Sequence, residues 1–103
     1  MQESITKSEL LTKLGNYVTI RPIISPRSGE AVRNQTAVIF ENGSLFQSYD
    51  TIIGVRTGGK LYLSEQHDCS VTTSKWCKEW CGYNAKERRD GLKSGRFLPM
   101  IND

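Results

Sequence analysis

The chain has 103 residues, which is the length of one compact domain, so we expect a single domain over residues 1–103. Hydrophobic residues make up 37% of it and charged residues 24%, and these values exclude a chain that is disordered throughout. No apolar run is long enough to cross a membrane, and the polar first residues lack the pattern of a signal peptide. We therefore expect a cytoplasmic protein without membrane contacts, whose cysteines are reduced.

The positive charge is concentrated in the last quarter of the chain. The formal net charge is +3, yet residues 1–74 contain as many acidic as basic residues, so the excess lies in residues 75–103. An uneven charge of this kind indicates an anionic partner. We predict that the basic side chains of this segment are exposed and form one partner-binding face, which consists of Lys75, Lys78, Lys86, Arg88, Arg89, Lys93 and Arg96.

The beginning of the chain predicts a short helix followed by a strand. Thr6 or Ser8 can cap a helix whose leucines lie on one face, and Gly15 can end it. Residues 17–24 are rich in β-branched and aromatic side chains, which is typical of a strand. Pro22 lies inside this strand and cannot donate a ladder hydrogen bond, which favours an edge strand or a bulge.

Two tight turns predict that the middle of the chain is an antiparallel meander. Asn42-Gly43 separates two β-branched and aromatic runs, and this dipeptide is the strongest short hairpin signal. In a two-residue turn at that site, Phe40 lies opposite Leu45. Gly58-Gly59 separates two further apolar runs in the same way. The pattern therefore predicts an antiparallel sheet of four or five strands.

The C-terminal half predicts an amphipathic helix over residues 73–82 that packs on this sheet. Thr72 or Thr73 would cap it, and its tryptophans and cysteines fall on one face. Residues 85–96 are charged and weakly periodic, which fits either a short exposed helix or a mobile loop. Residues 96–101 fit a final strand or a tail packed on the core. The predicted fold class is α+β: an antiparallel four- to five-stranded meander with the C-terminal-half helix packed on it and a short N-terminal helix.

The cysteines and the only histidine raise the question of a metal site. His67, Cys69, Cys77 and Cys81 offer the imidazole and thiolate ligands that zinc prefers. Structural zinc sites favour two closely spaced cysteine pairs, whereas these residues form one His-x-Cys and one helical Cys-x-x-x-Cys. Small buried thiols beside tryptophans are common. We therefore favour a chain without a metal or another cofactor, with Cys77 and Cys81 in the core and His67 in an exposed loop.

The residues form no recognisable catalytic constellation. The chain has one histidine and no pair of carboxylates spaced for acid–base chemistry, and Gly58-Gly59 lacks the surrounding pattern of a phosphate-binding loop. We therefore expect a protein that acts by binding and is not an enzyme.

The middle of the chain resembles a small domain of unknown function that is found in proteins of bacteriophages and other mobile elements. The resemblance covers residues 34–82 and lies in Gly43, in Ser48-Tyr49-Asp50-Thr51, in Ile53-Gly54 and in Ser70-Val71-Thr72-Thr73-Ser74-Lys75. It implies a phage origin and a sheet-plus-helix fold, but it carries over no activity, because none is assigned to that family. In that context the protein would inhibit or redirect a host factor in the host cell cytoplasm, for example as an anti-CRISPR protein that blocks a nuclease effector. The partner would be a host protein or a ribonucleoprotein complex.

The basic segment supports an alternative function. Residues 86–96 could make salt-sensitive contacts with phosphates, as in an accessory protein that binds nucleic acid weakly and without reading its sequence. No aromatic residue is interleaved with the basic ones in this segment. A solvated charged helix face is the simpler interpretation of the same pattern.

Overall fold

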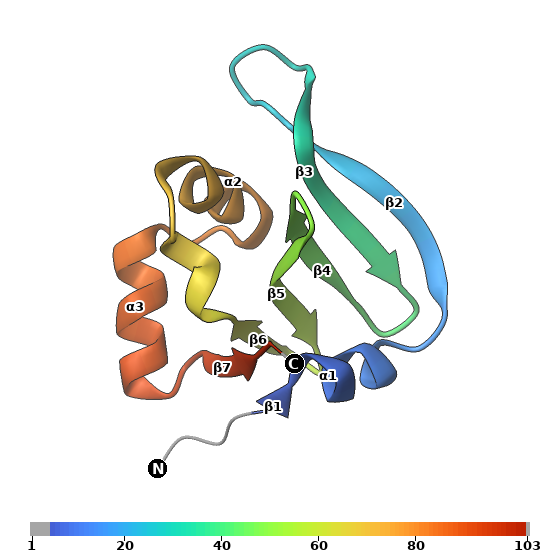
Figure 1. The fold of residues 1–103 in the computed structure, drawn as a ribbon, viewed down its shortest axis with the longest axis vertical. Coiled ribbons are helices and arrows are strands. Elements are labelled where there is room, and N and C mark those ends of the chain that lie inside the picture. Colours follow the sequence, from blue (N-terminus) through green and yellow to red (C-terminus); the bar gives the residue numbers. More distant parts are fainter. Residues whose placement is uncertain (1–4, 103) are drawn as a thin grey trace.

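The computed structural model describes residues 5–102. These residues form a seven-stranded sheet with helices packed against it (Figure 1). The strand order across the sheet is β1-β7-β6-β5-β4-β3-β2. The strands are β1 (Ile5–Thr6), β2 (Tyr17–Ile24), β3 (Ala31–Phe40), β4 (Gly43–Ser48), β5 (Thr51–Thr57), β6 (Lys60–Leu63) and β7 (Leu98–Ile101). The helices are α1 (Lys7–Leu14), the short 3-10 helix η1 (Glu65–Asp68), α2 (Val71–Cys81) and α3 (Ala85–Ser94).

Strands β2 to β6 form the antiparallel meander that the hairpin signals predict. The fold class is α+β, as expected, but the sheet is larger than predicted and is not purely antiparallel. β7 pairs in parallel with β6, and β1 pairs in parallel with β7. The connection explains the parallel pairing, because the chain leaves β6, crosses through η1, α2 and α3, and returns beside β6 in the same direction.

The hairpin between β3 and β4 does not have the expected register. Phe40 pairs with Gly43 and not with Leu45, so the turn residues are Glu41 and Asn42. The end of α1 explains the difference, because the carbonyl of its last residue accepts a hydrogen bond from the Asn42 backbone amide at 3.0 Å. Carbonyl groups at the end of a helix lack partners within the helix, so this contact stabilises the observed turn.

Three other local predictions are confirmed. Gly58-Gly59 forms a tight turn with φ angles of +60° and +73°, and Thr57 pairs with Lys60 across it. Pro22 lies in β2, at the edge of the sheet, beside an irregularity of the strand register. Thr6 caps α1 with its side chain.

Capping side chains also set the limits of the later helices. α2 begins earlier than predicted, because Ser70, and not Thr72 or Thr73, accepts the hydrogen bond of a first-turn amide. The charged segment after α2 is a regular helix, α3, and it begins with a reciprocal capping box between Asn84 and Glu87. The structure thus decides between the two alternatives that the sequence left open for this segment.

Apolar side chains form one cluster on each face of the sheet. α2 covers one face and buries Trp76 there, while Leu10 and Leu14 of α1 are buried on the other. Trp80 stacks on Phe46 of β4 with the ring centroids 6.0 Å apart, so the indoles hold α2 to the sheet as predicted. Within the described part of the chain, no helix combines the length and the apolar character that a membrane span requires.

Candidate functional site

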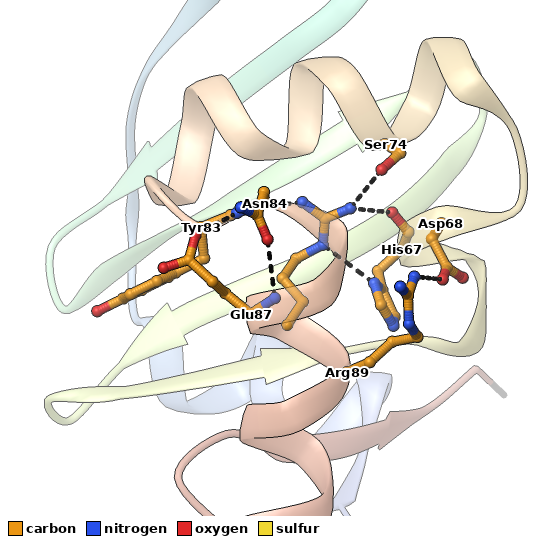
Figure 2. Close-up of polar contacts among 8 residues, drawn as sticks. His67, Asp68, Ser74, Tyr83, Asn84, Glu87 and Arg89 are labelled. Carbon is orange, nitrogen blue, oxygen red and sulfur yellow. Dashed lines mark hydrogen bonds and ion pairs between the residues drawn. The ribbon is translucent and has the colours of Figure 1, made fainter.

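Arg88 lies at the centre of a polar network between α3, α2 and η1. Its side chain is completely buried, with 0% of its surface exposed. Its Nε donates a hydrogen bond to Nδ1 of His67 at 3.0 Å, and its Nη1 donates to the Tyr83 carbonyl at 2.7 Å. Its Nη2 donates to the His67 carbonyl at 3.0 Å and to Ser74 Oγ at 2.6 Å (Figure 2). One guanidinium therefore joins the three helical segments.

The capping box at the start of α3 positions this arginine. Asn84 Oδ1 accepts from the Glu87 amide at 2.8 Å, and Glu87 Oε1 accepts from the Asn84 amide at 2.9 Å (Figure 2). The Arg88 amide makes the first helical hydrogen bond, to the Asn84 carbonyl, at 2.9 Å. These bonds fix the first turn of α3 in the orientation that directs Arg88 into the protein.

The charge of Arg88 has no carboxylate partner among the described residues. All of its hydrogen-bond acceptors are neutral groups. Asp68, the carboxylate next to His67 in the chain, pairs instead with the exposed Arg89 at 3.0 Å. A buried cation that no anion neutralises makes its surroundings electropositive.

The structure buries His67, which the sequence placed in an exposed loop. Because Nδ1 accepts a hydrogen bond from Arg88, the imidazole is neutral. Its pKa is lowered from the usual value of 6.5, first by burial and then by the charges of Arg88 and Arg89, although Asp68 acts in the opposite direction.

This arrangement predicts a stability that depends on pH. The lowered pKa means that the unfolded chain binds a proton at His67 more readily than the folded protein does. The free energy of unfolding should therefore fall as the pH is lowered through 6.5, the pKa of the unfolded state, and level off below the folded pKa. Urea unfolding between neutral and mildly acidic pH measures the effect.

A His67→Asn variant provides the control for this prediction. Its side-chain oxygen can still accept a hydrogen bond from Arg88, but it does not titrate. His67 is the only histidine of the chain, so the variant should lose the part of the pH dependence that comes from this imidazole. An unchanged dependence in His67→Asn would assign the effect to another group.

The four candidate zinc ligands are not brought together. Cys69 is exposed, whereas Cys77 and Cys81 are buried, which confirms the prediction for these two thiols. The hydrogen bond with Cys81, together with burial, raises the pKa of Cys77 above its usual range, so this thiol remains protonated. Among the described residues, no three His, Cys, Asp or Glu side chains are arranged to hold a metal ion.

The predicted basic face exists only in part, and its prediction was wrong for Arg88, which is buried. Arg88 points inward because its acceptors lie on α2, on η1 and in the α2–α3 connection. Two of the remaining charges are paired, Lys86 with Asp90 at 2.9 Å and Arg89 with Asp68. The exposed members of the predicted face are Lys75, Lys78, Lys86, Arg89, Lys93 and Arg96.

Two concave sites lie on the surface near these residues. The first, of about 550 Å³, is lined by Lys75 and Arg89 but also by the carboxylate of Asp68. The second, of about 490 Å³, lies between the β5–β6 turn and the two segments that flank α3. Of the described residues that line this second site, none is acidic and three are basic, so we call it the basic cleft. Its lining residues are Arg56, Gly59, Lys60, Leu61, Tyr83, Arg96 and Phe97.

Arg96 lies against two aromatic rings of this basic cleft. Its Cζ is 4.9 Å from the centre of the Tyr83 ring and 5.2 Å from that of Phe97. Its Nη2 also donates a hydrogen bond to the Tyr83 hydroxyl at 3.0 Å. The rings and the hydroxyl together fix the orientation of the guanidinium at the cleft.

Arg56 is held in a similar way on the opposite wall. Its Cζ lies 5.3 Å from the centre of the Trp80 ring, and its Nη2 donates to the Cys81 carbonyl at 3.0 Å. That carbonyl belongs to the last residue of α2, where the helix dipole favours a cation. The basic cleft therefore presents positive charges in set positions next to aromatic rings.

The sequence predicted Arg96 as a binding residue but missed the others in the cleft. Arg56 and Lys60 flank the turn at Gly58-Gly59, and this local signal could have indicated a basic hairpin tip. The approach of Tyr83 to Arg96 has no comparable signal, because α3 separates the two residues in the chain.

Comparison with known proteins gives one match. A family model described as a family of unknown function (DUF8033) matches residues 18–96, which is more than half of the chain. The chain belongs to the DUF8033 family. The DUF8033 match includes the network around Arg88 and, except for Phe97, every residue that lines the basic cleft. Neither a curated protein nor a solved structure matches the chain.

Proposed function

We propose that the protein is a non-enzymatic accessory protein that binds nucleic acid through the basic cleft. The observation that carries this proposal is the combination of Arg56, Lys60 and Arg96 around one concavity without an acidic lining residue in the described chain. Phosphates are attracted by such a cluster, and aromatic rings beside it offer surfaces for bases. The proposal moves the contact site away from residues 86–96, of which only Arg96 lines the cleft.

Lys60→Glu should weaken the binding of short oligonucleotides. Lys60 is exposed in the β5–β6 hairpin, so the folded structure should tolerate the change within about 0.5 kcal/mol. Loss of one phosphate contact should reduce the slope of log affinity against log salt concentration by about one. Fluorescence anisotropy with labelled DNA and RNA oligonucleotides at several salt concentrations measures both quantities.

Arg27→Glu is the matched control for this experiment. It makes the same change of charge, but in the exposed loop between β2 and β3, which projects from the far end of the sheet (Figure 1). It should change the affinity much less than Lys60→Glu does. Equal losses in both variants would mean that net charge, and not the cleft, governs binding, and no binding by the wild type would refute the proposal.

The edge of the sheet favours a second candidate function, the inhibition of a host protein or ribonucleoprotein complex. β2 is the outermost strand and exposes Tyr17, Val18, Ile20 and Ile24, each by at least half of its surface. An exposed apolar edge strand can pair with an extended segment of another protein. With the phage origin that the sequence resemblance implies, this supports an inhibitor, for example one that blocks a CRISPR nuclease effector.

The two candidates differ in how they respond to the cleft variant. If Lys60→Glu weakens oligonucleotide binding but inhibits a nuclease effector in cells as well as the wild type does, the edge strand is the working surface. If inhibition and oligonucleotide binding are weakened together, the basic cleft accounts for both.

A further inference from the structure

We infer that the basic cleft binds single-stranded nucleic acid by stacking one base on the guanidinium of Arg96. This inference rests on the proposed nucleic-acid function and specifies the kind of ligand. Three properties of the cleft carry it: its concave shape, the fixed plane of Arg96, and the position of the other cations.

The shape of the cleft favours an unpaired strand. Proteins read a duplex with a helix or a β-ribbon that projects into a groove, whereas unpaired bases enter concave sites and stack on flat side chains. The cleft has a volume of about 490 Å³, which falls in the range of small-molecule pockets. A nucleotide is a ligand of that class, and a duplex is not.

Arg96 offers the flat surface. Its guanidinium is held on the rings of Tyr83 and Phe97 and by the Tyr83 hydroxyl. Arg96 is exposed and lines the cleft, so a ligand in the cleft can reach its guanidinium. Bases stack on arginine planes as they do on aromatic rings, and an arginine that is already oriented loses less freedom on binding.

The other cations lie in the same cleft. Arg56 and Lys60, both in the β5–β6 hairpin, line it and can neutralise phosphates next to the stacked base. Gly59 lines the cleft beside Lys60, and nothing lies within 4 Å of the point where a Cβ would be. The sugar–phosphate backbone can therefore approach the hairpin at this point.

Arg96→Lys separates stacking from charge. The variant keeps the positive charge but loses the plane, and the position is exposed, so thermal unfolding should be unchanged. The probes are a labelled oligothymidylate, an abasic oligomer of the same length, and a duplex hairpin. Arg96→Lys should weaken the binding of the oligothymidylate about tenfold. The affinity for the abasic oligomer and the salt dependence of binding should stay unchanged, because the charge is kept.

Tyr83→Phe tests the orientation of Arg96. It keeps the ring but removes the hydroxyl that accepts the Arg96 hydrogen bond, so it should weaken oligothymidylate binding by a smaller factor than Arg96→Lys. The wild type should bind the oligothymidylate more tightly than the duplex.

The outcomes distinguish this inference from the proposed function. Equal effects of Arg96→Lys on the two single-stranded oligomers, or equal affinity of the wild type for single strand and duplex, would overturn the stacking inference and leave nucleic-acid binding in place. A wild type that binds none of the three probes at low salt would overturn both.

Discussion

Replacing Arg88 with methionine is expected to lower the free energy of unfolding by about 2–4 kcal/mol, although methionine fills much of the same space. The change leaves two carbonyls, a hydroxyl and an imidazole nitrogen without the donor that pairs with them. Each buried acceptor that loses its partner costs about 1–3 kcal/mol. The loss is smaller than the sum, because the folded state no longer has to bury a cation. Urea unfolding measures the difference.

The neighbouring residue provides a matched control for this prediction. Arg89→Met removes the same kind of side chain, but Arg89 is about half exposed, and among residues 5–102 its side chain makes one ion pair, with Asp68. Exposed pairs contribute about 0–1 kcal/mol, so this variant should unfold nearly as the wild type does. A similar loss in both variants would contradict the structural role of Arg88.

The contrast between Arg88 and Arg89 shows what the sequence could not predict. Two adjacent arginines in a charged segment look alike, and both were assigned to an exposed face. Their positions on α3 differ by about 100° around the helix axis, so Arg88 can point into the protein while Arg89 stays at the surface, where it pairs with Asp68. The acceptors of Arg88 are mostly main-chain and hydroxyl groups of distant segments, and such groups leave no charge pattern in the sequence.

Some features with local causes were predicted correctly, although the cap of α2 lies at Ser70 and not at Thr72 or Thr73. The tight turn at Gly58-Gly59 and the cap of α1 at Thr6 depend on residues that are adjacent in the chain. The register at Asn42 was missed because a carbonyl of α1 decides it. A strand within residues 96–101 was one of two predicted alternatives, but its parallel pairing was missed because its partner β6 precedes two helices. The basic cleft combines both cases, since Arg56 and Lys60 have a local signal and the contact of Tyr83 with Arg96 has none.

The side of α3 that faces the protein interior makes two structural contacts along its length. Arg88 in its first half joins it to α2 and η1, and Gly91 in its middle lies directly against the ring of Phe97. Phe97 packs on Tyr83 with the ring centroids 4.8 Å apart, and both rings support Arg96. The orientation of the guanidinium in the basic cleft therefore depends on the fit between α3 and Phe97.

Gly91→Ala is expected to destabilise the protein by about 1–3 kcal/mol, which is the opposite of the usual effect. In the interior of a helix, alanine is about 1 kcal/mol more favourable than glycine. Here the added Cβ would overlap the ring of Phe97, which is only 4% exposed and cannot move without disturbing the core. Thermal or urea unfolding of the variant measures the sign of the effect directly.

A double-mutant cycle with Phe97→Ala identifies the cause of this loss. Alanine removes the ring atoms that the new Cβ would meet, so the double variant should be more stable than the sum of the two single changes predicts, by about 0.5–3 kcal/mol. Gly91→Ala alone should also weaken oligonucleotide binding, because a displaced Phe97 no longer supports the plane of Arg96. Full additivity in the cycle would mean that the ring yields easily, and normal binding by Gly91→Ala would mean that Arg96 is oriented by Tyr83 alone.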